Sequence, residues 1–150
     1  MNKTNRDVDV QPAGILDLLD FQGLSRRCFG QDAWPWFDML AALLTPKAES
    51  FKAVQQGRTV GYVIGDRREK DLGWIASIAV APEARRHGIG TRLLREAENA
   101  LGAPRVRLAL RPSNEAALNL YRQQGYSRAD RWPAYYRDGE DALVMEKKIH

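Results

Sequence analysis

The sequence is poor in residues that crosslink chains or bind metals. Its 150 residues include one cysteine, Cys28, and two histidines, His87 and His150. A lone cysteine forms no internal disulfide, and no cluster of other metal-binding residues accompanies it. We therefore expect neither a disulfide-stapled fold nor a zinc site, and no metal cofactor.

Long apolar runs are also lacking. No stretch approaches the roughly 20 residues that a membrane-spanning helix needs. The first residues, "MNKTNRDVDV", have no apolar core of the kind that a secretory signal contains. We expect a soluble, cytoplasmic protein without a membrane partner.

Charge of one sign is not gathered into blocks. Lys and Arg number 23 against 19 Asp and Glu, which gives a formal net charge of +4. The basic residues are scattered, with short pairs such as Arg26-Arg27 and Lys147-Lys148 that are typical of solvated surfaces. This argues against nucleic acid as a partner, although a basic nucleic-acid binder stays an alternative.

The patterning that is present predicts one mixed α/β domain over residues 1–150. No repeat or linker divides the chain, and 150 residues suffice for a core. Periodicity and turn residues predict the following elements in order. They are a short strand within 7–13 that breaks at Pro12, helices at 13–29 and 33–46, a hairpin at 51–66, a buried strand at 72–82, a helix at 88–101, a strand at 106–110, a helix at 115–124 and a closing hairpin at 126–149.

One loop has the features of an anion site. The buried strand ends in "VAPEARRHGIG", which opens the helix at 88–101. The first N–H groups of a helix lack intrahelical acceptors, and Gly88 and Gly90 let an anion approach them closely. Arg85 and Arg86 add positive charge suited to phosphate. No lysine follows Gly90 as in a P-loop, and the third glycine of the dinucleotide fingerprint is missing. A plain helix start is the alternative.

These residues resemble the GCN5-related N-acetyltransferase (GNAT) superfamily. Its loop Arg/Gln-x-x-Gly-x-Gly/Ala matches within "VAPEARRHGIG", and "RPSNEAALNLYRQQGY" is similar to its Asn-x-x-Ala-x-x-Leu-Tyr segment. "CFGQDAWPW" and "AYYRDGEDALVMEKKI" resemble the bacterial ribosomal-protein alanine N-acetyltransferases. Together the motifs cover roughly residues 25–149. The resemblance implies a mixed, mostly antiparallel central sheet of about six or seven strands flanked by about four helices.

The resemblance implies acetyl-CoA as the cosubstrate. The backbone of the strand "SIAV" would pair with the pantetheine arm, and the loop N–H groups would hold the pyrophosphate. Asn114 would contact the arm, or serve only as a helix N-cap. The implied donor-binding residues are Ile78, Ala79, Val80, Arg85, Arg86, His87, Gly88, Ile89, Gly90, Thr91 and Asn114.

The implied chemistry is direct attack of a neutral amine on the thioester carbonyl in a ternary complex. The backbone N–H of Val80 would stabilise the oxyanion, and Tyr121 would protonate the leaving thiolate as general acid. A core aromatic is the alternative for Tyr121. The general base is unknown, because the glutamate that the ribosomal-protein enzymes place five residues before the Asn is Ala109 here.

Other groups fit the role of base poorly. His87 lies in the pyrophosphate loop and points away from the acceptor. The remaining candidates are more simply surface or turn residues, namely Asp38, Ser77, Glu140 and Asp141. An amine with a low pKa can react with only water to relay its proton.

The acceptor is expected between "AWPWFDML" and "RWPAYYRD". The candidate substrate-binding residues are Trp34, Trp36, Ser77, Tyr135 and Tyr136, with Trp132 beside them, and core packing is their alternative. The predicted function is transfer of an acetyl group to a primary amine, favouring a protein or peptide N-terminus. A small-molecule amine acetyltransferase and a CoA-binding module with little catalysis are the alternatives, and the oligomeric state is left open.

Overall fold

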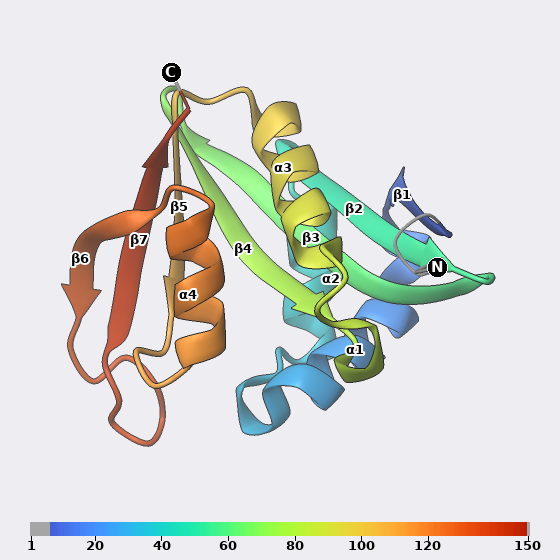
Figure 1. The fold of residues 1–150 in the computed structure, drawn as a ribbon, viewed down its shortest axis with the longest axis horizontal. Helices are drawn as coiled ribbons and strands as arrows, with labels where there is room; N and C mark the ends of the chain where they lie inside the picture. Colours follow the sequence, from blue (N-terminus) through green and yellow to red (C-terminus); the bar gives the residue numbers. More distant parts are fainter. Residues whose placement is uncertain (1–6, 150) are drawn as a thin grey trace.

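The computed structural model describes residues 7–149, which form one seven-stranded sheet flanked by helices (Figure 1). The strand order is β1-β2-β3-β4-β5-β7-β6, and only β4 and β5 run parallel. The strands are β1 (Val8–Pro12), β2 (Ala48–Gln55), β3 (Arg58–Glu69), β4 (Leu72–Val80), β5 (Arg105–Leu110), β6 (Ser127–Trp132) and β7 (Ala142–Lys148). The helices are α1 (Leu18–Phe29), α2 (Trp36–Leu44), α3 (Ile89–Leu101) and α4 (Glu115–Gln123), with short 3₁₀ turns η1 (Ile15–Asp17), η2 (Gly30–Asp32) and η3 (Pro82–Ala84). The expected fold class and element order are confirmed.

Helices cover both faces of the sheet. Gly61 of β3 faces α3, because a Cβ placed there would lie 3.0 Å from Leu93 Cδ1. The next residue, Tyr62, stacks on Phe21 of α1 at 4.6 Å between ring centroids. Successive side chains of a strand point to opposite faces, so α3 and α1 pack on opposite sides of β3. The predicted helix at 88–101 is α3, and its apolar face, Ile89, Leu93, Leu94, Ala97 and Leu101, is buried.

Helix α1 buries a narrower face than its sequence suggests. Phe21, Leu24 and Ser25 are buried, whereas Ile15 and Leu19 are 51% and 84% exposed. The apolar residues at the start of the predicted helix therefore lie partly in η1 and partly on the solvent side of α1.

A bulge in β4 opens a gap in the middle of the sheet. Ile64 and Gly65 of β3 are opposite Ser77 and Ile75, which leaves Ala76 as an extra residue in β4. Such a bulge bends its strand. Pairing with β5 ends at the same point, at Ile75↔Leu108, so residues 76–80 have no partner in β5. Figure 1 shows the two strands diverging from here to their C-terminal ends.

A buried charged cluster holds the two halves of the sheet together on the α3 face. Glu98 of α3 is only 5% exposed. It accepts a hydrogen bond from the Tyr126 hydroxyl at 2.7 Å and from Lys147 Nζ of β7 at 3.0 Å. A buried carboxylate needs such partners to stay charged. The cluster therefore links α3 to the segment after α4 and to β7.

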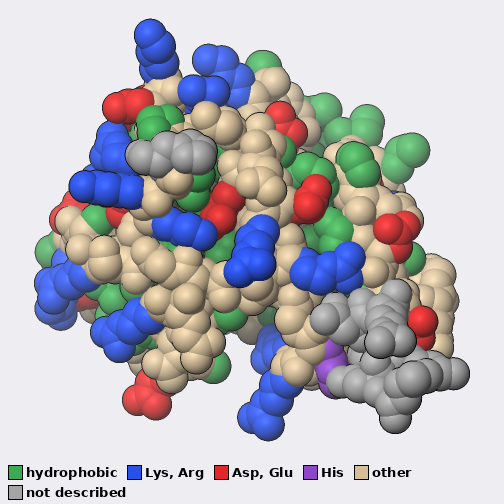
Figure 2. Space-filling model, turned by 45° about the horizontal axis from the view of Figure 1, so that its top comes forward, with side chains coloured by type: hydrophobic (Ala, Val, Ile, Leu, Met, Phe, Trp, Pro, Cys, Tyr) green, Lys and Arg blue, Asp and Glu red, His purple; other side chains and the backbone are tan. Residues whose placement is uncertain are grey.

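The surface carries both signs of charge. On the face in Figure 2, Lys and Arg side chains lie interspersed with Asp and Glu. Among the described residues, no helix combines the length and apolar character that crossing a membrane requires.

Adding a methyl group at Gly61 tests how closely α3 packs on β3. We expect Gly61→Ala to lower the free energy of unfolding by about 1–3 kcal/mol, because its Cβ meets Leu93 and the Ala79 carbonyl oxygen, 3.1 Å away. Gly23→Ala is the control: Gly23 lies exposed in α1 with nothing within 4 Å of a Cβ, so the change should stabilise by about 0.5–1 kcal/mol. Urea denaturation of both variants measures the difference, and equal effects would contradict the packing.

Candidate functional site

The unpaired end of β4 presents backbone groups to the gap. Ala81 N–H donates to the Val60 carbonyl of the neighbouring strand at 2.8 Å. Backbone groups alternate between the two sides of an antiparallel strand. Those of Ala79 therefore also face β3, where it pairs with Tyr62, and those of Ile78 and Val80 face the gap.

The Val80 carbonyl already has partners, whereas its N–H faces the gap. Arg85 Nε donates to this carbonyl at 3.0 Å, and Cys28 Sγ of α1 lies 3.4 Å from it. The two contacts fix the end of β4 against α1 and against the following loop. What the gap offers to a ligand at this residue is therefore the N–H of Val80.

The loop between β4 and α3 has an irregular backbone that exposes N–H groups. Arg86 and Gly88 have φ angles of +69° and +78°, both in the left-handed region. Alternation of handedness in such loops gathers successive N–H groups around a concavity that suits an anion. Ile89, Gly90 and Thr91 form the first turn of α3, whose N–H groups lack intrahelical acceptors.

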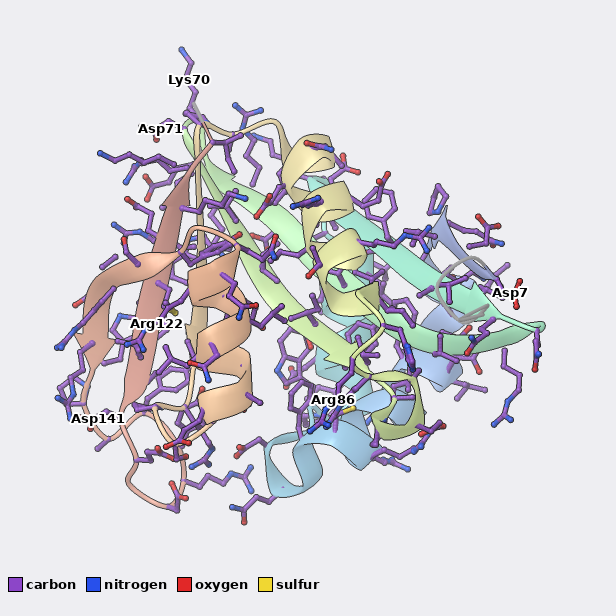
Figure 3. The ribbon with its side chains drawn as sticks, in the orientation of Figure 1. Asp7, Lys70, Asp71, Arg86, Arg122 and Asp141 are labelled. Carbon is purple, nitrogen blue, oxygen red and sulfur yellow. The ribbon has the colours of Figure 1, made fainter. Side chains whose placement is uncertain are left out.

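This loop lies at the open end of the gap. Figure 3 places Arg86 at this end of the molecule and Lys70 and Asp71 at the opposite end. Gly90 faces the gap directly, because a Cβ there would lie 3.6 Å from Leu120 of α4 and 3.8 Å from Val80. The His87 ring is half-buried, and its Nδ1 is buried without a hydrogen-bond partner among the described residues.

Helix α4 supplies the other side of the gap. Asn114 is its N-cap, and its side-chain oxygen accepts a hydrogen bond from Ala117 N–H at 3.2 Å. Tyr121 is buried, with its ring edge-on to Tyr126 at 5.9 Å. Burial, and to a smaller extent the charge of Tyr136, raises the pKa of Tyr121 to about 12. Its phenol therefore keeps its proton throughout the physiological range.

Aromatic side chains meet at a pocket of about 230 Å³ between the α1–α2 segment and the β6–β7 loop. Three of the candidate substrate-binding residues, Trp34, Tyr135 and Tyr136, line it together with Gln31, Asp32, Ala33, Pro35 and Arg137. Trp36 is not part of the lining; it is 58% exposed and packs edge-on to Phe37. Ser77 is not part of the lining either; its hydroxyl lies 2.8 Å from that of Tyr62.

The carboxylates near this pocket are held in ion pairs. Arg111, directly after β5, binds both oxygens of Asp32 at 2.7 and 2.9 Å and Glu140 at 2.8 Å. Arg111 and Ser113 hold the pKa of Glu140 below its ordinary value. The Ala134 N–H and Arg131 do the same for the pKa of Asp141, which Figure 3 places at this end of the molecule. A carboxylate whose pKa is lowered is a weaker base.

Ala109 occupies an apolar position. It pairs with Val144 of β7 and packs against a small cluster of Leu72, Trp74, Val144 and Trp132. The rings of Trp74 and Trp132 stack at 5.7 Å between centroids. Ala109, where the resemblance implies a glutamate, thus adds an apolar side chain to this cluster.

A second hollow lies away from these groups. It measures about 470 Å³ and is open and largely polar, and no predicted site residue lines it. Its lining is Pro46, Lys47, Glu49, Arg67, Lys70, Ala100 and Leu101. Size alone therefore does not select the functional site; the backbone gap and the aromatic pocket do.

Comparison with known proteins agrees with this geometry. Residues 16–126 match the acetyltransferase (GNAT) family. The chain belongs to the GNAT family. The gap fits acetyl-CoA, the cosubstrate of GNAT enzymes, because it joins unpaired strand N–H groups to an anion-binding loop.

Individual GNAT relatives match nearly the whole chain. An N-alpha-acetyltransferase of Sulfurisphaera tokodaii is 31% identical over 158 residues, covering 95% of this chain and 94% of the relative. The catalytic subunit of the N-terminal acetyltransferase A complex of Arabidopsis thaliana is 33% identical over 150 residues, covering 95% and 78%. The crystal structure of the ribosomal-protein-S18-alanine N-acetyltransferase from Escherichia coli superimposes with a TM-score of 0.86 at 26% identity, covering 95% and 94%.

Prediction from sequence missed part of this GNAT site. Arg111 lies inside a matched motif, but nothing local shows that it binds Asp32, 79 positions away. The sequence excludes Cys28 from disulfides and metal sites, but it gives no signal that Cys28 contacts the end of β4. Because buried charges need partners, one could have expected Arg111 to form ion pairs, but not with which carboxylates.

Alanine substitutions at two glycines, one at each end of α3, distinguish an effect on donor binding from an effect on stability. Gly88 and Gly102 have φ angles of +78° and +61°, so alanine at either should cost about 1–2 kcal/mol of stability. We expect Gly88→Ala also to weaken acetyl-CoA binding measured by calorimetry, because it distorts the anion loop. Gly102→Ala, at the far end of the helix, should leave binding unchanged. Equal losses of affinity in both variants would contradict the role of the loop.

Proposed function

We propose that this chain transfers the acetyl group of acetyl-CoA to the α-amine of a protein or peptide N-terminus. The observation that carries the proposal is the pocket between the α1–α2 segment and the β6–β7 loop. Figure 1 shows both segments at the end of the molecule toward which β4 and β5 diverge. Its aromatic walls suit the first residues of a peptide. The relatives named for acetylation of N-termini and of a ribosomal-protein alanine support the same acceptor.

On the donor side, backbone groups would do most of the binding. A pantetheine amide would pair with the backbone of Ile78, which faces the gap, while the Val80 N–H would contact the thioester oxygen. The backbone groups of Ala79 face β3, so Ala79 would not pair with the donor, contrary to the expectation from sequence. The pyrophosphate would lie on the loop from Arg85 to Thr91. Asn114 remains within this proposal through its amide nitrogen, because its oxygen caps α4.

The proton transfers would proceed without a carboxylate base. A free α-amine with a pKa near 8 is about one-tenth neutral at pH 7, whereas a lysine amine is neutral to only about one part in 2,500. The neutral amine attacks the thioester carbonyl, and the Val80 N–H stabilises the oxyanion. Collapse breaks the C–S bond, Tyr121 protonates the thiolate, and water takes the proton that the nitrogen loses. Tyr121 then regains a proton from solvent before the next turnover. Because the amine must lose its proton before it attacks, this mechanism favours α-amines over lysine side chains.

Three further expectations remain predictions. They are a cytoplasmic location, the absence of a metal cofactor, and the extent of one domain over residues 1–150. None of them affects the assignment of donor and acceptor sites.

The pH dependence tests this mechanism. The pKa of Tyr121, raised to about 12, keeps the phenol protonated, so kcat/KM for a peptide should rise through the amine pKa near 8 and hold to about pH 10. Tyr121→Phe should lower the plateau by about 10²–10⁴-fold and leave the rise in place. A rise centred near pH 4–5 would instead reveal a carboxylate base. An unchanged plateau would remove Tyr121 from the mechanism.

An acceptor screen tests the proposed function itself. Release of free CoA thiol should be fastest with peptides bearing a free N-terminus. It should be at least about tenfold slower with N-blocked peptides that offer only lysine, given the difference in neutral amine. Faster turnover of small amines would favour the small-molecule alternative. Binding of acetyl-CoA without turnover across the panel would favour a CoA-binding module.

A further inference from the structure

Arg111 joins three separate parts of the chain at the acceptor pocket. It follows β5 directly, and its side chain is 18% exposed. Nε and Nη2 bind the two oxygens of Asp32, the last residue of η2, in a forked arrangement. Nη1 binds Asp138 at 2.8 Å and Glu140 at 2.8 Å, both in the β6–β7 loop. One side chain thus ties both walls of the pocket to the sheet.

The Arg111 guanidinium also packs on the ring of Tyr136, which lines the pocket. Its carbon lies 4.1 Å from the centre of the Tyr136 ring, a cation–π distance. The loop folds back on itself here, because Tyr136 N–H donates to the Glu140 carbonyl at 3.1 Å. Arg111 therefore contacts Tyr136 directly and the ends of its turn through Asp138 and Glu140.

A lysine at position 111 could not reproduce these contacts with the same geometry. The planar fork of arginine offers parallel N–H groups to a carboxylate, whereas a lysine presents a single point charge. Without Arg111, Asp32 in the pocket lining and the nearby Asp138 and Glu140 would lose the guanidinium that they share and would repel one another. Repulsion between them would separate the η2 wall from the β6–β7 wall.

We propose that Arg111 is a positioning residue for the amine acceptor, which sets the spacing of the two pocket walls and the orientation of Tyr136. The proposal rests on the proposed function and names the residue that forms its acceptor site. Arg111 touches neither the thioester nor the amine; it acts through Asp32, Tyr136 and Glu140. Donor binding depends on β4 and the loop before α3, so it should not need Arg111.

The test compares Arg111→Lys with a matched variant in β6. Arg131→Lys also replaces an arginine paired with a carboxylate, Asp141, but among the described residues no hydrogen bond or ion pair joins Arg131 to Asp32 or Tyr136. Steady-state kinetics with an N-terminal peptide should show the peptide KM raised about 10-fold or more in Arg111→Lys, consistent with loss of charge-assisted hydrogen bonds. Arg131→Lys should stay within about twofold of the parent protein.

Binding of acetyl-CoA, measured by calorimetry, separates positioning from general damage to the fold. We expect the Kd of Arg111→Lys for acetyl-CoA to stay within about twofold of the parent value. A similar loss of donor affinity would show a structural role and overturn the proposal. An unchanged peptide KM would overturn it as well. If the parent protein acetylates no peptide, the proposed function fails instead, which is a different result.

A double variant tests whether Arg111 acts through Asp32. Asp32→Asn should raise the peptide KM on its own, because it releases the η2 wall. The effects of neighbours in one network are not additive. Arg111→Lys combined with Asp32→Asn should therefore be no worse than the more impaired single variant, within about twofold. Effects that multiply would show independent roles and overturn the proposal.

Discussion

The bulge at Ala76 is the constraint on which the rest of the site depends. One extra residue in β4 turns the strand away from β5 just where their pairing stops. A continuous sheet would satisfy the backbone groups of Ile78 and Val80 with a neighbouring strand. The bulge leaves them for a ligand, and the same change of direction carries the end of β4 to the loop before α3. Strand pairing and donor binding are therefore alternatives at this edge.

The two sides of the site depend on different forces. On the donor side, backbone geometry does the work, through an unpaired strand, a loop with two left-handed residues and the first turn of α3. On the acceptor side, charged side chains from distant segments meet on Arg111. The donor side should therefore tolerate many side-chain changes outside its glycines. The acceptor side should respond to single charge changes and to salt, which screens partly exposed charges.

Features that depend on residues close together in the sequence could be predicted from it. The helix at 88–101, the Asn114 cap, the hairpin at 51–66 and the anion loop follow from periodicity and local backbone preferences. The inward face of α1 did not, because Leu19 and Phe21 are both apolar and only the sheet decides which is buried. The bulge has no local signature either, since Ala76 fits a regular strand as well. The pairs that Arg111 forms depend on segments that only the complete fold brings together.

The gap also links the stability of this protein to its donor. A ligand that binds only the folded chain adds about 2.7 kcal/mol to the free energy of unfolding when its concentration is a hundred times its Kd. An open strand edge in the middle of a sheet is also a place where another chain can pair. A donor that occupied residues 76–80 would close this edge. Resistance to unfolding and to aggregation would then rise and fall with the supply of acetyl-CoA.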